Sequence, residues 1–103
     1  MTNRLETLLQ FYNEDPGDPF NIYGLALEYL KSDLSKSREL FIILLDKHPD
    51  YLPAYYHAAK LFGDLNERMK AIEIFEKGIA LPKKTGDAKA ARELQSAYDE
   101  LIF

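Results

Sequence analysis

Two histidines are the first side chains in this sequence that could carry catalytic or metal-binding chemistry. His48 precedes Pro49 at a predicted helix end, where an imidazolium would meet the negative end of the helix dipole. His57 stands beside Tyr56 on a predicted helix. A zinc site needs clustered ligands, and the sequence has neither cysteine nor two histidines one helical turn apart. We therefore interpret His48 as structural and His57 as a surface residue, with contact to a ligand as the alternative for His57.

The other candidate for chemistry is the acidic group formed by Glu14, Asp15 and Asp18. These carboxylates surround Pro16-Gly17 and lack the Asp-x-Asp-x-Asp-Gly order of a calcium loop. We interpret them as helix caps and solvated charge. The sequence also contains no glycine-rich phosphate loop and no serine nucleophile elbow. We therefore expect a protein that is not an enzyme and that binds no cofactor and no metal.

The strongest pattern in the sequence is a repeat of apolar and small residues. Its first copy reads Ile22-x-x-Leu25-Ala26-x-x-Tyr29, then Ser37-x-x-x-Phe41 and Pro49, and its second reads Tyr55-x-x-Ala58-Ala59-x-x-Phe62, then Ala71-x-x-x-Phe75 and Pro82. Ala26 and Ala59 are 33 residues apart, and Phe41 and Phe75 are 34 apart. A period near 34 built from helical spacings is typical of stacked helix pairs.

The elements that carry this repeat are predicted to be six helices. The apolar spacing places them at about residues 3–14, 19–30, 34–47, 52–62, 67–81 and 88–101, and no segment alternates as a strand would. Asp18 and Asp87 are expected to cap the second and sixth helices. Residues 63–66 are expected to form a turn, with Asp64 and Glu67 as a capping box for the fifth helix.

This spacing resembles the tetratricopeptide repeat signature, W-x-x-L-G-x-x-Y followed by A-x-x-x-F and P. The resemblance implies an all-α, right-handed α-solenoid of antiparallel helix pairs. It divides a single domain, 1–103, into an N-terminal half-repeat helix (1–17), repeat 1 (18–50), repeat 2 (51–84) and a C-terminal capping helix (85–103). The chain departs from the signature where Ile22 and Tyr55 replace Trp, and where alanine replaces glycine in both repeats.

By the same resemblance, the first helix of each repeat lines a concave groove that binds a peptide or a partner's helix. The alternative is that the terminal helices fold over this groove and bury its apolar residues. The implied groove residues are Phe20, Tyr23, Leu27 and Leu30 in repeat 1; Pro53, Tyr56, His57, Lys60 and Asp64 in repeat 2; and Lys89, Arg92 and Ser96 in the last helix. One subclass of the family binds acidic C-terminal peptides through a clamp of Lys, Asn and Arg. Three positions of that clamp would fall at Tyr23, Leu27 and His57, and none matches, so a more apolar ligand fits better.

Composition limits the classes of partner. Thirteen Lys and Arg against seventeen Asp and Glu give a net charge of −4, which argues against nucleic acid or an anionic membrane as the main partner. The absence of cysteine and of any long apolar run favours a cytoplasmic protein. The resemblance and the composition thus indicate a protein–protein interaction module. The alternatives are a scaffold that forms homodimers or larger homo-oligomers, and an accessory or regulatory subunit of an enzyme complex.

The charge balance generates a first prediction. With a net charge of −4 and no basic stripe, the protein is expected not to bind duplex DNA appreciably at physiological salt. A gel-shift titration measures this. Micromolar binding that weakens steeply with added salt would contradict the prediction.

Overall fold

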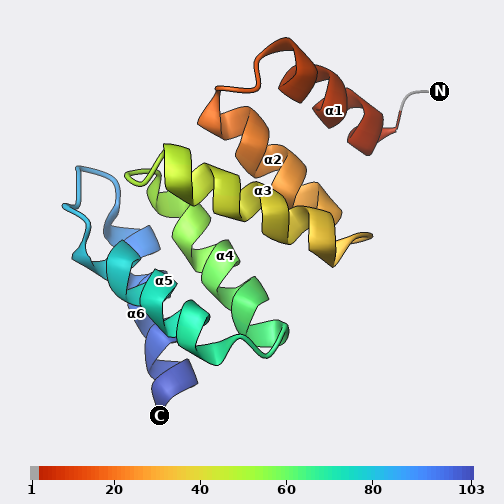
Figure 1. Ribbon diagram of the computed structural model, residues 1–103. Helices are drawn as coiled ribbons and strands as arrows, with labels where there is room; N and C mark the ends of the chain where they lie inside the picture. The colour runs from red at the N-terminus through yellow and green to blue at the C-terminus, as the bar shows by residue number, and fades with distance from the viewer. Residues whose placement is uncertain (1–2) are drawn as a thin grey trace. The chain divides into compact units, whose positions relative to one another are not determined.

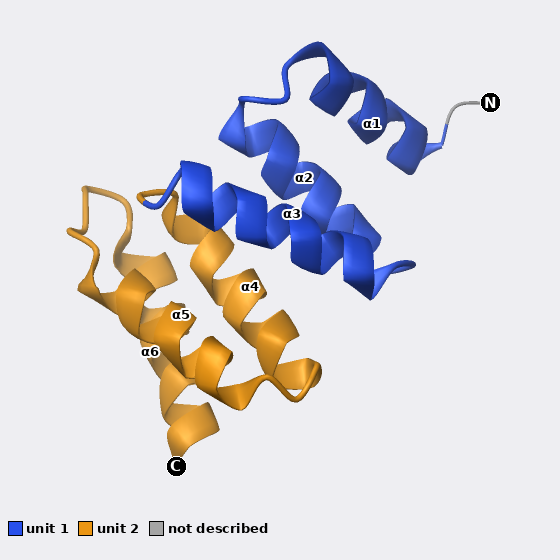
Figure 2. Cartoon of the chain, in the orientation of Figure 1, with its two compact units in different colours: residues 1–49 blue, residues 50–103 orange. Residues whose placement is uncertain are grey.

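The computed structural model describes residues 3–103, and this part of the chain is all α-helix, turns and loops without a strand. The six helices are α1 (Arg4–Glu14), α2 (Pro19–Tyr29), α3 (Leu34–Lys47), α4 (Leu52–Asp64), α5 (Arg68–Ala80) and α6 (Ala88–Ile102) (Figure 1). They lie where the apolar periodicity predicted them. Within this chain two compact units can be distinguished: unit 1 is residues 1–49 and unit 2 is residues 50–103 (Figure 2).

Unit 1 is built around α2, which packs against both α1 and α3. The face of α2 toward α3 is buried, and the side chains that fill this core are Ile22, Leu25, Ala26, Tyr29, Leu40, Phe41 and Leu44. Ser37 is the buried polar residue there, and its Oγ donates a hydrogen bond to the Ala26 carbonyl oxygen at 2.7 Å. A small alanine and a small serine thus let the two helices approach closely, because neither side chain separates the backbones.

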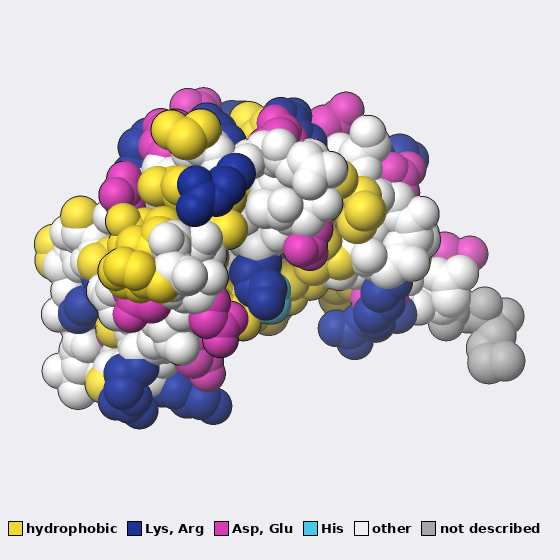
Figure 3. Space-filling model, turned by 90° about the horizontal axis from the view of Figure 1, so that it is seen from below, with side chains coloured by type: hydrophobic (Ala, Val, Ile, Leu, Met, Phe, Trp, Pro, Cys, Tyr) yellow, Lys and Arg dark blue, Asp and Glu magenta, His cyan; other side chains and the backbone are white. Residues whose placement is uncertain are grey.

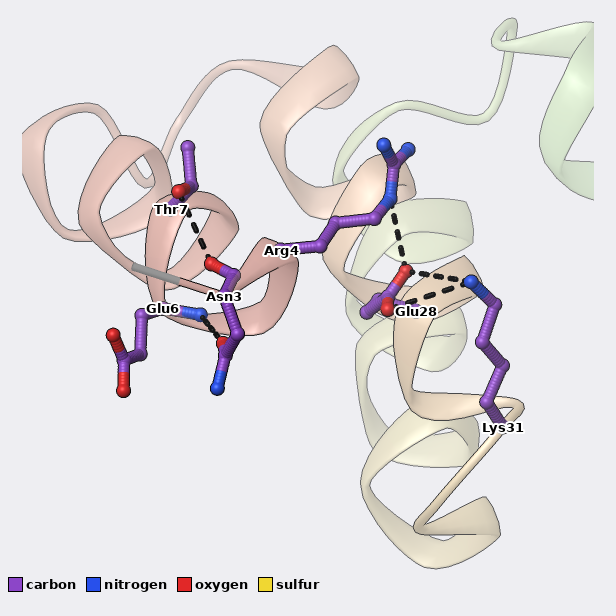
Figure 4. A network of polar contacts seen from close by, with 6 residues as sticks. All are labelled: Asn3, Arg4, Glu6, Thr7, Glu28 and Lys31. Carbon is purple, nitrogen blue, oxygen red and sulfur yellow. Dashed lines mark hydrogen bonds and ion pairs between the residues drawn. The ribbon is translucent and has the colours of Figure 1, made fainter. Parts of the chain in front are cut away.

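A second face of α2 holds α1. A Cβ atom on Gly24 would lie 3.4 Å from a terminal methyl carbon of Leu8, so α1 rests closely on α2 at this glycine. Glu28 accepts a hydrogen bond from Arg4 at 3.0 Å and lies 3.2 Å from Lys31 Nζ (Figure 4). These exposed ion pairs contribute little stability, typically about 0–1 kcal/mol each. Of the two, only the Arg4 pair with Glu28 joins α1 to α2.

Unit 2 packs α4 against both α5 and α6, and α5 against α6. Its core consists of Leu52, Ala54, Tyr55, Ala58, Ala59, Leu61, Phe62, Ala71, Ile74, Phe75 and Leu94. The helices approach closely at Gly78 on α5. A Cβ atom there would lie 2.8 Å from Tyr55 Cβ and 2.8 Å from a terminal methyl carbon of Leu94. Glycine is required at this position because any side chain would push α5 away from both neighbours.

The helix ends confirm one capping prediction and correct two. Asp18 caps α2 as expected, accepting a hydrogen bond from the Phe20 N–H at 2.9 Å. Asp87 stands at the N-cap position of α6 but makes no capping bond. Its carboxylate instead accepts from the Lys84 N–H at 2.8 Å and closes the preceding loop.

The predicted capping box of Asp64 and Glu67 was wrong. Gly63 and Asp64 belong to α4, which continues two residues beyond the predicted end, and Glu67 makes no side-chain capping bond to α5. The helix ends two residues later than predicted because Asn66 adopts a left-handed conformation with φ of 63°. The Glu67 N–H then donates to the Phe62 carbonyl at 2.8 Å, and the Asn66 N–H to Gly63 at 3.1 Å. These two bonds form a Schellman ending with asparagine in the left-handed position.

The two mid-helix glycines generate a matched prediction. Gly78→Ala places a methyl group against Tyr55 and Leu94, and overpacking of this kind costs about 1–3 kcal/mol. Gly24→Ala meets only the flexible end of Leu8, so it gains helix propensity of roughly 1 kcal/mol without a clash. Urea denaturation should therefore show Gly78→Ala to be less stable than Gly24→Ala. Equal free energies of unfolding would contradict the close approach at Gly78.

Candidate functional site

In unit 1, the third face of α2 carries the predicted groove residues of repeat 1. Phe20 is 70% exposed, and Tyr23, Leu27 and Leu30 are half-buried. Because the other two faces of α2 pack on α1 and α3, these four side chains line the remaining face at helical spacings. The structure therefore brings this part of the prediction together as one apolar surface, here called the α2 face.

Sequence reasoning missed Phe11 as a neighbour of this surface. Phe11 lies on α1, is 48% exposed, and falls outside the stripe of Leu5, Leu8, Leu9 and Tyr12. Its carbonyl oxygen accepts a hydrogen bond from Asn21 Nδ2 at 3.2 Å, which places Phe11 beside the segment that carries Phe20. The signal was present in the sequence, since an aromatic residue that falls off an apolar stripe points away from the core that the stripe contacts.

In unit 2, α4 carries three predicted site residues in contact with one another. The rings of Tyr56 and His57 meet edge to face with centroids 5.2 Å apart, and Lys60 Nζ lies 5.7 Å from the Tyr56 ring centroid. Tyr56 and His57 are half-buried and Lys60 is exposed. We call these three residues the α4 cluster. An ammonium group over an aromatic face is attracted to the ring's negative quadrupole, so Lys60 and Tyr56 orient each other.

Burial lowers the pKa of His57 below its usual 6.5, because a desolvated imidazole resists protonation. Glu93 on α6 raises this pKa and Lys60 lowers it, both by smaller amounts than burial. Sequence reasoning missed Glu93 because the register of α6 against α4 is a tertiary property. Arg92, an implied groove residue of the last helix, is exposed on α6 and has no hydrogen bond or ion pair within residues 3–103.

The remaining residues considered for chemistry have structural roles. His48 is the C-cap of α3, and its N–H donates to the Leu44 carbonyl at 2.8 Å, as expected for a residue at a helix end. Among residues 3–103, no three His, Asp or Glu side chains are grouped so that they could hold a metal ion. Within the same residues, no helix has both the length and the apolar character needed to span a membrane.

Lysines and arginines are dispersed on the molecular face in Figure 3. They occur there as several separate groups, with acidic and hydrophobic side chains between them. Exposed pairs such as Lys77 Nζ with Glu73 Oε1, at 3.0 Å, show how the two signs alternate along α5.

Paired helices that follow the repeat spacing define the class of protein: an all-α helical-repeat protein. Comparison with solved structures identifies the family. A crystal structure of a tetratricopeptide repeat domain protein from Salinibacter ruber is 38% identical, covers 82% of this chain and 96% of that one, and gives a TM-score of 0.77. A solution NMR structure of such a protein from the same organism is 40% identical, covers 84% and 89%, and also gives 0.77.

The chain belongs to the tetratricopeptide repeat family. No protein-family model and no curated protein matches the sequence. The structural matches confirm the family and the all-α solenoid class that the repeat spacing indicated. The family is generally non-catalytic and generally mediates protein–protein interactions, so membership supports that broad role for this chain.

The lowered pKa of His57 generates a prediction about pH. Above pH 6.5 His57 is neutral in both native and unfolded chains, and its contribution to stability is complete. Between 6.5 and the lower native pKa, the unfolded chain binds a proton that the native chain does not, so the free energy of unfolding falls as pH falls. Urea denaturation across this pH interval should show the decrease in the free energy of unfolding. The decrease should be smaller in His57→Gln. His48→Gln is the matched control. An NMR titration that places the pKa of His57 at or above 6.5 would contradict the prediction.

Proposed function

We propose that this protein binds a peptide or helix of a protein partner through the first helix of each repeat, in the concave groove that the family resemblance implies. The contacting residues would be Phe20, Tyr23, Leu27 and Leu30 on the α2 face, Tyr56, His57 and Lys60 of the α4 cluster, and Arg92 on α6. The repeat boundaries at 18–50 and 51–84 remain part of this proposal, as does a cytoplasmic location. Self-association and service as a subunit of an enzyme complex are the alternatives.

The observation that carries the proposal is the exposure of Phe20 at the end of the α2 face. Phe20 is 70% exposed and falls at helical spacing from the half-buried Tyr23, Leu27 and Leu30 on the same side of α2. A contiguous exposed apolar surface is typical of an interaction site, whereas isolated exposed apolar residues are not informative. Burying this surface against an amphipathic helix or peptide would recover its hydrophobic free energy.

The α4 cluster supports the proposal with different chemistry. Tyr56 offers a large apolar ring with a polar tip and loses little rotamer entropy on binding, which is typical of binding hot spots. Lys60 over that ring supplies a cation that can pair with an acidic group of the ligand. The ligand class that suits both surfaces is a mainly apolar segment with an acidic residue. This class differs from the acidic C-terminal tails that a Lys–Asn clamp selects, because that clamp is missing here.

The proposal is tested with ligands selected from a random peptide library on the immobilised protein. Tyr23→Ala or Tyr56→Ala should each weaken binding of a selected peptide by about 1–2 kcal/mol, because each removes a large contact area. Isothermal titration calorimetry measures the affinity and urea denaturation measures the stability. Leu34→Ala, which truncates a 43% exposed apolar side chain on α3, is the matched control and should leave affinity unchanged. A large loss of stability with unaltered affinity would mean that the tyrosines belong to the core.

A further inference from the structure

The apolar α2 face has an aromatic neighbour on α1, at the turn between the two helices. Asn21 Nδ2 donates to the carbonyl oxygens of Phe11 and Asp15, each at 3.2 Å, so the end of α1 is held against the start of α2. Phe11 is 48% exposed and Phe20 is 70% exposed. The turn therefore presents two exposed aromatic rings beside the half-buried part of the α2 face. We call Phe11 and the α2 face together the α1–α2 surface.

Three carboxylates stand beside these two rings. Glu14 follows Phe11 by three residues, so their side chains are neighbours on the surface of α1. The Asp18 carboxylate accepts a hydrogen bond from the Phe20 N–H at 2.9 Å, and Asp15 lies in the turn between the helices. Glu14 and Asp15 are exposed and Asp18 is half-buried. None of the three forms an ion pair within residues 3–103.

The opposite end of the same helix pair is electrically balanced. Glu28 lies 3.0 Å from Arg4 and 3.2 Å from Lys31 (Figure 4). With Glu6 near the start of α1, two carboxylates there stand against two basic side chains. The net negative charge of the α1–α2 surface is therefore concentrated at the turn, where its two most exposed rings lie.

This combination of rings and carboxylates favours a basic ligand. In the last turn of α3, the charges of Asp46 and Lys47 cancel, so α3 adds no net charge there. Arginine suits the site best, because its planar guanidinium stacks on aromatic rings and pairs with carboxylates through two hydrogen bonds. An acidic ligand would instead bring like charges together, which opposes association.

We propose that the partner segment that binds the α1–α2 surface is basic. Its apolar side chains would cover Tyr23 and Leu27, and its arginine or lysine residues would contact Phe11, Phe20 and the carboxylates at the turn. This inference rests on the proposed function, to which it adds the charge of the ligand and a contribution from α1. The acidic residue that suits Lys60 of the α4 cluster belongs to a different part of the ligand.

Three versions of one synthetic peptide test the sign of the charge. The peptide is an amphipathic helix with one leucine stripe, and the residues that flank the stripe are arginine, glutamine or glutamate. Isothermal titration calorimetry should show the arginine version to bind about tenfold more tightly than the glutamine version, because several exposed ion pairs each contribute a modest amount. The glutamate version should bind most weakly. Added sodium chloride should reduce these differences, because salt screens exposed charges.

Variants of the protein identify the surface that produces the preference. Glu14→Gln combined with Asp15→Asn should reduce the tenfold preference for arginine to about twofold, because Asp18 alone then remains. Phe11→Ser should weaken binding of the arginine version, because it removes a ring on which a guanidinium stacks. The matched control is Glu39→Gln combined with Glu100→Gln, which removes two exposed carboxylates from α3 and α6. This control should keep the full preference for arginine.

Several outcomes would overturn this inference. They are equal affinity for the three peptides, tightest binding of the glutamate version, no binding of any version, and a preference for arginine that falls equally in the control variant. The proposed function is judged separately, by whether Tyr23→Ala weakens the peptides selected from the random library. Selected peptides that depend on Tyr23 without any preference for basic residues would leave the binding surface in place and exclude the basic ligand.

Discussion

Close approach of paired helices is the constraint on which the other features of each unit depend. In unit 2, α5 can lie against both α4 and α6 because Gly78 has no side chain to separate it from Tyr55 and Leu94. In unit 1 the same proximity is marked by the short bond from Ser37 to the Ala26 carbonyl. Interiors packed at crystal density tolerate neither an added methyl group nor a void at such points. The positions of the large aromatic residues follow, because they fill the space on either side of each contact.

This packing also determines which surfaces remain for binding. Once one side of α2 is covered by α3 and another by α1, the side that carries Phe20 and Tyr23 is the one left for solvent or a partner. Helix α4 contacts α5 and α6, and Tyr56 and Lys60 lie on its less buried side. Core residues and the residues proposed for binding therefore alternate along one helix. Their separation follows from helical geometry rather than from composition.

The sequence was sufficient to predict the helices, because apolar periodicity and matched offsets depend on spacing alone. It was insufficient at Gly63, which was read as a helix stop. In the structure a Cβ atom on Gly63 would lie 3.9 Å from Ala71 Cβ, so this glycine faces the neighbouring helix, and Asn66 performs the termination. Glycine can end a helix or allow a neighbouring helix to approach closely, and tertiary contacts decide which of the two occurs. The influence of Glu93 on His57 likewise required the register of α6, which no local pattern encodes.

Helix α1 contains no buried residue, although it covers one side of α2. Its attachment includes the contact at Gly24, two bonds from Asn21 to the Phe11 and Asp15 carbonyls, the Arg4 pair with Glu28 and the half-buried stripe of Leu5, Leu8, Leu9 and Tyr12. Because no side chain of α1 is fully buried, local opening of this helix should require less free energy than unfolding of the core. Such an opening would uncover Gly24 and its surroundings on α2.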